Sequence, residues 1–342
     1  MKRRVRASSW SRRFGLGAAA ITRSAARSGT RMLVQLLKPV PAKRRPVSRA
    51  VDLVPGVAIG PTGARRFGLY RPPGMAVGDR PPLLVMLHGC GQDAAGFAAS
   101  TRMNHIARRE RFLVLYPEQD RLANLQGCWN WFDTASGRAG AEMALILTAI
   151  DQVCLLYQAD RARVAIAGFS AGASMAALLA ARHPGRFKAV AMHSGIPPGT
   201  AHSTLSALGA MRGRRSTKAP RAAGAVSIAW PPLLVIHGAA DAVVSPANGL
   251  AAARLWAGAA GASAGEARTV QRGRRHPISV TYFRRGAVLV ATLAEVSGLA
   301  HAWSGGAAGQ TLGDVHGPDA SSMVWAFAAK QFRATDAALR RG

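Results

Sequence analysis

A serine that could act as a nucleophile lies in segment 168–172, which reads Gly-Phe-Ser-Ala-Gly. The apolar run 164–167 precedes this segment and an Ala-rich stretch follows it. Flanking glycines let a chain turn sharply and lift the serine hydroxyl above a sheet, and the N-terminus of the next helix favours a developing oxyanion. The motif alone is weak, but a strand before it and a helix after it predict Ser170 to be a nucleophile rather than part of a structural turn.

A nucleophilic serine needs a base, and the base needs an acid that orients it, in the chain order serine, acid, histidine. Three acids follow Ser170 before His301: Asp241, Glu266 and Glu295. Asp241 comes shortly after the apolar run 233–236, where a buried strand would end, and such strand ends carry catalytic groups. Glu266 lies in a Gly/Ala loop and Glu295 lies in or at the end of a strand. We therefore predict Asp241 as the acid, with a turn-capping aspartate as the alternative.

Three histidines follow Asp241, and their positions differ. His276 lies in an Arg-rich loop before a strand, and His316 lies in a loop close to the final helix. His301 follows the apolar stretch 287–296, in the loop from which a base should reach the serine. We predict His301 as the general base.

An oxyanion hole needs two N–H groups that face the developing charge. The amide of Ala171, directly after the serine, should supply one. The loop after the apolar run 83–87 reads His-Gly-Cys-Gly-Gln, and its glycines allow close approach to a substrate, so we predict the Cys90 amide as the second. His88 and His237 each precede a glycine at a strand end, and we interpret both as structural histidines.

The elements that must position these groups follow an α/β pattern. Short apolar runs predict strands buried on both faces, and Ala-rich stretches between them predict helices. The strands are expected at 83–87, 112–116, 164–167, 189–192, 233–236 and 288–293, and the helices near 94–110, 138–157, 171–183, 246–258 and 319–332. This alternation predicts a doubly wound, mostly parallel sheet with helices on both faces, in a single domain over 51–342. A hairpin at 56–60 and 64–71 would form its antiparallel edge, and 199–228 is expected to be a long surface loop.

The charge is concentrated at the beginning of the chain. The protein has 45 basic and 16 acidic residues, and residues 1–49 contain 14 of the basic ones and no acid. We expect residues 1–50 to be a separate basic arm with a Pro/Arg-rich linker. One hypothesis is contact with an anionic surface or granule, and the alternative is a solvated surface of an Arg-rich composition. No sequence-specific nucleic-acid contact is predicted.

The arm also contains a run, 15–21, that resembles a degenerate twin-arginine signal. It is short and weakly apolar for a secretory signal, and a basic amphipathic helix over about 10–38 is the alternative. No stretch of 18 or more apolar residues is free of charge, so we expect no transmembrane helix.

Three cysteines are too few for a disulfide scaffold. Cys90 and Cys128 lie in loop-like, Gly-flanked segments, and either a bridge or two reduced thiols would fit them. Cys154 lies in an apolar helical stretch, and we expect a buried free thiol. No metal site or cofactor is predicted.

Taken together, these motifs resemble the polyhydroxybutyrate-depolymerase-type esterases, which are related to feruloyl and acetylxylan esterases. The resemblance covers about 53–335. Its most telling segments are Cys-Trp-Asn-Trp at 128–131 and His-Ala-Trp-Ser-Gly-Gly at 301–306. Further matching segments are 87–92, 116–119, 127–132, 168–172, 193–195, 237–238 with Asp241, and 318–320.

The resemblance implies a secreted, cofactor-free α/β-hydrolase that cuts 3-hydroxyalkanoate polyesters or related esters, in the extracellular space or periplasm. It also implies a Cys90–Cys128 disulfide and the oxyanion role of Cys90. The chain departs from the family pattern at Ala173, where glycine is usual, and at 239–240, which is usually more polar. The basic arm is not the usual cleaved signal, so a cytoplasmic or granule-associated location stays open. We expect no separate polymer-binding module after 335.

Three tryptophans, Trp129, Trp131 and Trp303, could line a cleft for acyl chains or polymer, because aromatic rings offer rigid apolar surface. Ordinary core packing is the alternative for each. Other functional hypotheses are a feruloyl or acetylxylan esterase and a serine peptidase of the same fold. From a different class, the chain could be a granule- or surface-binding protein whose hydrolase body is idle.

Overall fold

The computed structural model describes residues 52–76, 78–215, 217 and 229–339. The basic arm, the signal-like run and the amphipathic-helix alternative all lie in 1–51, outside the described residues. The division of the chain at residue 50 therefore stays a prediction.

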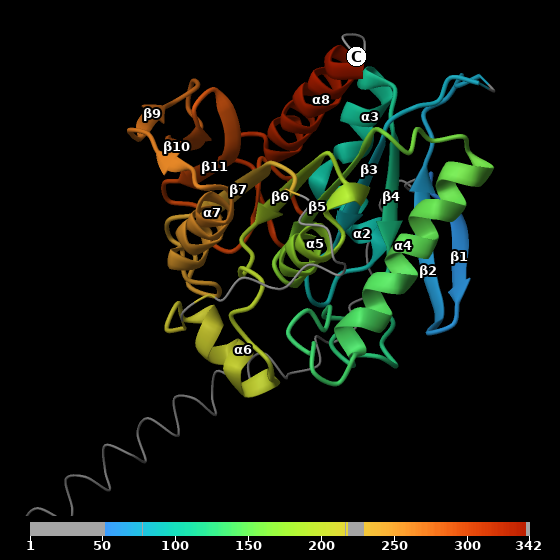
Figure 1. The fold of residues 1–342 in the computed structure, drawn as a ribbon, viewed down its shortest axis with the longest axis horizontal. Coiled ribbons are helices and arrows are strands. Elements are labelled where there is room, and N and C mark those ends of the chain that lie inside the picture. Colours follow the sequence, from blue (N-terminus) through green and yellow to red (C-terminus); the bar gives the residue numbers. More distant parts are fainter. Residues whose placement is uncertain (1–51, 77, 216, 218–228, 340–342) are drawn as a thin grey trace, which may run out of the picture. The chain divides into compact units, whose positions relative to one another are not determined.

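The described residues from 52 onward fold around one mixed sheet of eleven strands in the order β1-β2-β4-β3-β5-β6-β7-β11-β10-β8, with β9 paired to β10 (Figure 1). Its parallel centre consists of β4 (Leu113–Pro117), β3 (Leu83–Leu87), β5 (Val164–Phe169), β6 (Ala189–His193), β7 (Leu233–Gly238) and β11 (Val288–Val296). Every residue of β3 to β7 is buried, which is why these strands are continuous apolar runs.

Antiparallel strands form both edges. On one side β1 (Val54–Gly60) pairs with β2 (Gly63–Tyr70), and β2 pairs with β4. On the other side β10 (Ile278–Arg285) pairs with β11, β8 (Ser263–Ala264) and β9 (Arg268–Val270). A separate two-stranded pair joins β12 (Trp303–Ser304) to β13 (Gly313–Asp314).

Helices cover both faces of the sheet and create two cores. On the face toward the viewer in Figure 1 lie α4 (Arg138–Leu156), α5 (Ala171–Arg182) and α7 (Ala247–Ala260), and behind the sheet lie α2 (Ala94–Thr101), α3 (Met103–Glu110) and α8 (Ala320–Leu339). Alternate residues of β3 serve the two cores. Leu83, Val85 and Leu87 pack on the first face, whereas Leu84 and Met86 pack on the second. The chain has the predicted doubly wound α/β-hydrolase fold.

The structure adds the short strands β8, β9, β12 and β13 to those expected from the sequence, and three longer elements also differ. The helix expected at 94–110 is interrupted at Arg102, which has a φ of 55° and donates to the Gly305 carbonyl at 2.8 Å. Strand β10 was missed as an apolar run because it is only partly buried. The expected loop 199–228 contains the helix α6 (Thr204–Met211), while residues 216 and 218–228 lie outside the described part. A serine pair, Ser203 and Ser206, forms its capping box, and this is a weaker signal than the usual Glu.

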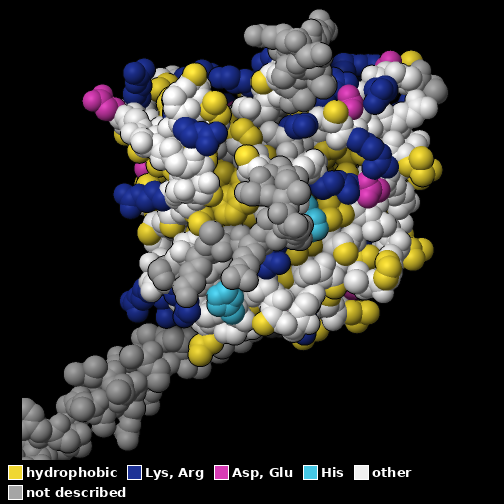
Figure 2. All heavy atoms as spheres, in the orientation of Figure 1, with side chains coloured by type: hydrophobic (Ala, Val, Ile, Leu, Met, Phe, Trp, Pro, Cys, Tyr) yellow, Lys and Arg dark blue, Asp and Glu magenta, His cyan; other side chains and the backbone are white. Residues whose placement is uncertain are grey.

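One described helix, α4, is apolar enough over 18 residues to cross a membrane, with a mean hydropathy of 1.6. Half of this stretch is buried inside the protein, and α4 packs against β1, β2 and β4. A core helix passes the same test, and the packing accounts for the apolar composition. On the face shown in Figure 2, Lys and Arg side chains are spread widely with few acids among them.

Candidate active site

The turn that carries Ser170 joins β5 to α5 and is sterically constrained. Ser170 has φ 54° and ψ −122°, in a region that L-residues rarely adopt. A Cβ on Gly168 would lie 2.3 Å from the carbonyl of Gly172, and a Cβ on Gly172 would lie 2.2 Å from the Leu87 carbonyl oxygen. Only glycine fits at either position. The Ser170 amide donates to the His193 carbonyl at 2.9 Å, which fixes the turn to the neighbouring strand.

The structure brings together the serine, acid and base predicted from the sequence. His301 Nε2 lies 3.0 Å from Ser170 Oγ, and His301 Nδ1 lies 2.8 Å from Asp241 Oδ2. Ser170 follows β5, Asp241 follows β7 and His301 follows β11, so all three meet at the carboxyl edge of the parallel strands. His276 and His316 lie beside each other instead, with ring centroids 6.2 Å apart.

The second carboxylate oxygen of Asp241 is also occupied. Asp241 Oδ1 accepts the amides of Val243 at 3.0 Å and Val244 at 2.8 Å. Burial raises the pKa of Asp241, but the hydrogen bond and charge of His301 and the Val244 amide outweigh it, so the pKa lies below its ordinary value. The geometry keeps Asp241 ionised and aimed at the imidazole.

Two further buried histidines, His193 and His237, hydrogen-bond to the backbone of segments close to His301 and Asp241. His193 Nε2 accepts the Ser304 amide at 3.1 Å, and its ring stacks on Trp303 with centroids 4.9 Å apart. Burial lowers the pKa of His193 to about 3, so this ring is neutral. His237 Nε2 donates to the Val244 carbonyl at 3.0 Å, as the structural role predicted for it requires. His193 was not singled out by chemistry in the sequence; its signal is a histidine at the end of a fully apolar strand.

The two predicted oxyanion donors lie on the other side of Ser170. Ala171 begins α5, and Cys90 lies in the loop after β3. Within the described residues, neither amide donates a hydrogen bond to another protein group. Cys90 is bonded to Cys128 in a disulfide, which resolves the alternative of two reduced thiols, while Cys154 is free and buried. Burial lowers the pKa of His88 to about 4, and its Nε2 accepts the Gln119 amide at 3.0 Å, so His88 is structural as predicted.

The three tryptophans are packed in the interior. The exposed fractions of Trp129, Trp131 and Trp303 are 0%, 6% and 1%. Trp129 Nε1 donates to the His88 carbonyl at 3.1 Å, and Trp303 Nε1 donates to Ser321 Oγ at 3.1 Å. Packing therefore accounts for all three, and their role in substrate binding stays a prediction that their exposure does not support.

Exposed leucines occur instead on two segments that follow parallel strands. Leu122 and Leu125, in the segment between β4 and α4, are 94% and 86% exposed, and Leu205 on α6 is 80% exposed. The first segment contacts the loop 88–92, which carries the predicted donor Cys90 and is called the oxyanion loop below, because the Gly91 amide donates to the Gln126 carbonyl at 2.9 Å. Single exposed leucines have no distinguishing pattern in a sequence, so these positions were not among the predicted site residues. They are candidate contacts for an apolar substrate.

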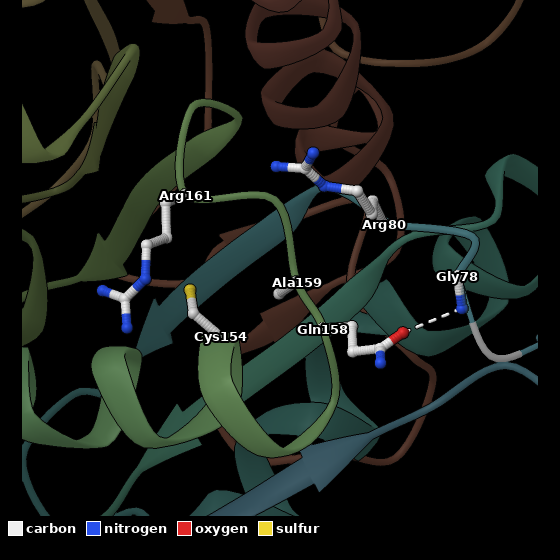
Figure 3. Close-up of a pocket in the computed structure, with 6 residues that line it drawn as sticks. All are labelled: Gly78, Arg80, Cys154, Gln158, Ala159 and Arg161. Atoms are coloured by element: carbon white, nitrogen blue, oxygen red, sulfur yellow. Dashed lines mark hydrogen bonds between the residues drawn. The ribbon is translucent and has the colours of Figure 1, made fainter.

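A surface hollow near Cys154 is not part of this site. Its lining residues are Gly78, Arg80, Cys154, Gln158, Ala159 and Arg161 (Figure 3). Most of them precede β3 or β5 in the chain, so the hollow opens at the amino edge of the sheet, opposite Ser170. Burial raises the pKa of the Cys154 thiol, which makes it a poor nucleophile. Among the described residues, no group of three or more His, Cys, Asp or Glu is arranged to hold a metal ion.

The fold is that of the α/β-hydrolases. A solved acetyl xylan esterase from Aspergillus awamori has the same fold, with a TM-score of 0.63, 21% identity, and coverage of 73% of this chain and 93% of that one. The family model described as esterase PHB depolymerase matches residues 65–274, more than half of the chain, and the protein belongs to that family. The matched residues include Ser170 and Asp241 and end before His301.

Curated relatives fall into more than one substrate class. The chain is 34% identical over 176 residues to poly(3-hydroxyalkanoate) depolymerase C of Paucimonas lemoignei, an alignment that covers 49% of this chain and 42% of that protein. It is 29% identical over 215 residues to feruloyl esterase B of Neurospora crassa, with coverage of 59% and 72%. The alignment with the depolymerase thus covers less than half of that protein's length. The family assignment made from the sequence motifs is confirmed.

Proposed function

We propose that this protein is a serine esterase that hydrolyses 3-hydroxyalkanoate esters, polyesters included, through an acyl-enzyme. The observation that carries the proposal is the continuous hydrogen-bond chain from Ser170 Oγ through both nitrogens of His301 to buried Asp241. Such a chain activates a hydroxyl that is otherwise a weak nucleophile.

In the proposed first half-reaction, Ser170 Oγ attacks the ester carbonyl and its proton passes to His301 Nε2. Asp241, ionised and bonded to Nδ1, holds the tautomer and stabilises the imidazolium. The amides of Cys90 and Ala171 receive the oxyanion of the tetrahedral intermediate. Collapse of the intermediate breaks the bond to the alcohol, which leaves with the proton from His301.

In the second half-reaction, water attacks the acyl-enzyme and gives its proton to His301. The carboxylic acid is then released as Ser170 recovers its proton. The acyl and alcohol parts of a 3-hydroxyalkanoate chain are apolar with regularly spaced esters, and the exposed Leu122, Leu125 and Leu205 could contact such a chain. The likeness to the depolymerase also supports this substrate class.

A location outside the cytoplasm goes with this proposal. The Cys90–Cys128 disulfide is the kind of bond that persists in oxidising compartments. Feruloyl or acetylated-xylan esters are the second candidate substrates, because feruloyl esterase B aligns with 59% of the chain and acetylxylan esterase A of Emericella nidulans aligns with 57%.

The test is release of 3-hydroxybutyrate from amorphous polyhydroxybutyrate, with Ser170→Ala as the inactive variant and Ser263→Ala, on the distant strand β8, as the matched control. We expect release by the wild type and by Ser263→Ala, and none by Ser170→Ala. Methyl ferulate, acetylated xylan and an aminoacyl amide are measured in parallel. A folded wild type active only on one of these would replace the polyester proposal with the corresponding esterase or peptidase. Polyester binding without any hydrolysis would favour the idle binding protein.

A further inference from the structure

A buried polar cluster lies behind the oxyanion loop, and the proposed reaction steps do not use it. Its members Arg65, Gln119, Asn130 and Glu142 have exposed fractions of 4%, 4%, 1% and 2%. Burying charged groups is costly unless they are paired and hydrogen-bonded. A cluster of this kind beside a catalytic loop therefore needs an explanation.

The carboxylate of Glu142 is the centre of the cluster. Glu142 Oε1 accepts Gln119 Nε2 at 2.6 Å and Asn130 Nδ2 at 2.6 Å, and Glu142 Oε2 accepts the Asn130 amide at 2.9 Å. Glu142 lies on α4, whereas Gln119 and Asn130 lie on the segment between β4 and α4. One carboxylate thus ties two parts of that segment to a core helix.

That segment in turn holds the oxyanion loop by several bonds. Gln119 Nε2 also donates to the Cys128 carbonyl at 2.9 Å. Cys128 is bonded to Cys90, and the neighbouring Trp129 donates to the His88 carbonyl at 3.1 Å. A disulfide joins two sulfurs through rotatable bonds, so it limits the distance of Cys90 more than the direction of its amide. The hydrogen bonds around it supply the direction.

Arg65 provides the opposite charge. Its Nη1 donates to Gln119 Oε1 and to the Glu118 carbonyl, and its guanidinium lies 5.6 Å from the centre of the Trp129 ring. Burial lowers the pKa of Arg65, and the charges of Glu142 and Asp120 oppose that effect. Gln119 connects the two side chains, because its oxygen accepts from Arg65 and its side-chain amide donates to Glu142.

We propose that Glu142 is a positioning residue for the oxyanion hole: its carboxylate fixes the Gln119 side chain, which bonds the Cys128 carbonyl, and the Asn130 backbone, and through this segment the Cys90 amide is aimed at the reacting carbonyl. The inference rests on the proposed function. It predicts that Glu142 acts on the transition state and not on substrate binding, because an oxyanion exists only after attack.

The test compares Glu142→Gln and Glu142→Asp with the wild type on a soluble p-nitrophenyl ester. Asp151→Asn is the matched control, a carboxylate-to-amide change on the same helix whose partners, Arg161 and Arg186, lie at the surface. Glutamine places an N–H₂ group where only acceptors are wanted. Active sites are counted by titration with a phosphonate that reacts with the nucleophile, so that kcat refers to folded enzyme alone.

For Glu142→Gln we expect kcat to fall by roughly tenfold, part of the loss that removing a whole oxyanion donor causes, with KM within about twofold. Affinity for a trifluoromethyl ketone, which forms the tetrahedral adduct, should fall by about the same factor. Glu142→Asp keeps the charge and should recover part of kcat, and Asp151→Asn should match the wild type.

An unchanged kcat per titrated site in both Glu142 variants, with only a lower melting temperature, would overturn the proposal. An equal loss in Asp151→Asn would overturn it as well. Where Glu142→Gln does not fold, Glu142→Asp carries the same comparison. Loss of the proposed function is recognised separately, since a folded wild type without ester hydrolysis would remove both proposals.

Discussion

The two sides of Ser170 are built by different physical means. On the base side, Asp241 uses its carboxylate oxygens on two backbone amides and on His301 Nδ1, an imidazole that gains a proton during the proposed reaction. On the oxyanion side, Glu142 accepts three hydrogen bonds from a backbone amide and two side-chain amides, none of which changes charge. Both carboxylates are buried, but only Asp241 is bonded to a group that changes its protonation state in the proposed reaction.

The difference indicates that the charge of Asp241 stabilises a cation that forms during the proposed reaction. The charge of Glu142 instead holds hydrogen-bond donors in place. Loss of the Asp241 charge should remove the stabilisation of the His301 imidazolium. Loss of the Glu142 charge should shift the position of the oxyanion donors without weakening them as donors. Substitutions on the two sides should therefore differ in magnitude and in pH dependence.

The largest effect should come from the base side. Asp241→Asn keeps the volume but cannot hold the imidazole tautomer or stabilise its cation, so kcat should fall by about 10⁴-fold, as equivalent changes do in serine hydrolases. The measurement is kcat per titrated site on a p-nitrophenyl ester. A loss below about tenfold would place Asp241 outside the machinery, and Glu295→Gln serves as the control acid.

Removal of the disulfide on the oxyanion side should lower the stability of the protein more than its activity. The bridge closes a separation of 38 residues, and its loss in a Cys90→Ala/Cys128→Ala variant should lower the free energy of unfolding by roughly 2–4 kcal/mol. The hydrogen bonds from Gln119, Trp129 and Glu142 remain in this variant. We therefore expect measurable residual activity at low temperature, tested by urea unfolding and by kcat. Activity as low as that of Ser170→Ala would show that the disulfide alone maintains the loop.

Acid should weaken the base side over a wider pH range than the oxyanion side, where burial holds the pKa of His88 at about 4. Burial holds the pKa of His193 at about 3, below its unfolded value of about 6.5, so the unfolded state binds the extra proton between these limits. The contribution of His193 to the free energy of unfolding is fully present above pH 6.5. It is lost as the pH falls toward 3, by roughly 1 kcal/mol per pH unit. Urea unfolding from pH 6.5 to 4.5 should show a shallower slope for His193→Gln. An identical slope in the variant would exclude His193 as a source.

The smallest effect should come from the exposed leucines. Leu122→Ser/Leu125→Ser removes apolar side chains that make the segment before α4 attractive to an insoluble polyester. Hydrolysis of suspended polyhydroxybutyrate should fall by about threefold, with no change on a soluble ester, because the lost apolar contacts act only on adsorption to the polymer. Leu155→Ser, on the exposed end of α4, is the control. Equal losses on both substrates would place the effect in the reaction centre.

Much of the base side could be predicted because its residues are tied to strand ends. Gly168 and Gly172 are required by contacts under 2.5 Å, and this steric demand is visible as a motif. Asp241 and His301 follow the strands β7 and β11, whose apolar runs are clear, and the chain order leaves few competitors. The parallel sheet was predictable for the same reason, since its central strands are buried on both faces.

Less of the oxyanion side could be predicted, because its contacts join residues with no common pattern. Glu142 occurs in a mostly apolar helix, where a charged residue is expected to face solvent, and its partners are 12 and 23 residues away. The tryptophans were ambiguous, since an indole suits both a cleft and a core. Arg102 and the serine cap of α6 depend on local backbone bonds that apolar periodicity does not encode.

The close contact of Gly172 with the Leu87 carbonyl has a consequence for how such an enzyme can diversify. The start of α5 and the end of β3 are in contact with no room for one methyl group. The nucleophile and the oxyanion loop, which follow from these two ends, therefore cannot shift independently of each other. Changes of specificity, in evolution or in the laboratory, should therefore accumulate around α6, where insertions leave the nucleophile and the oxyanion loop undisturbed.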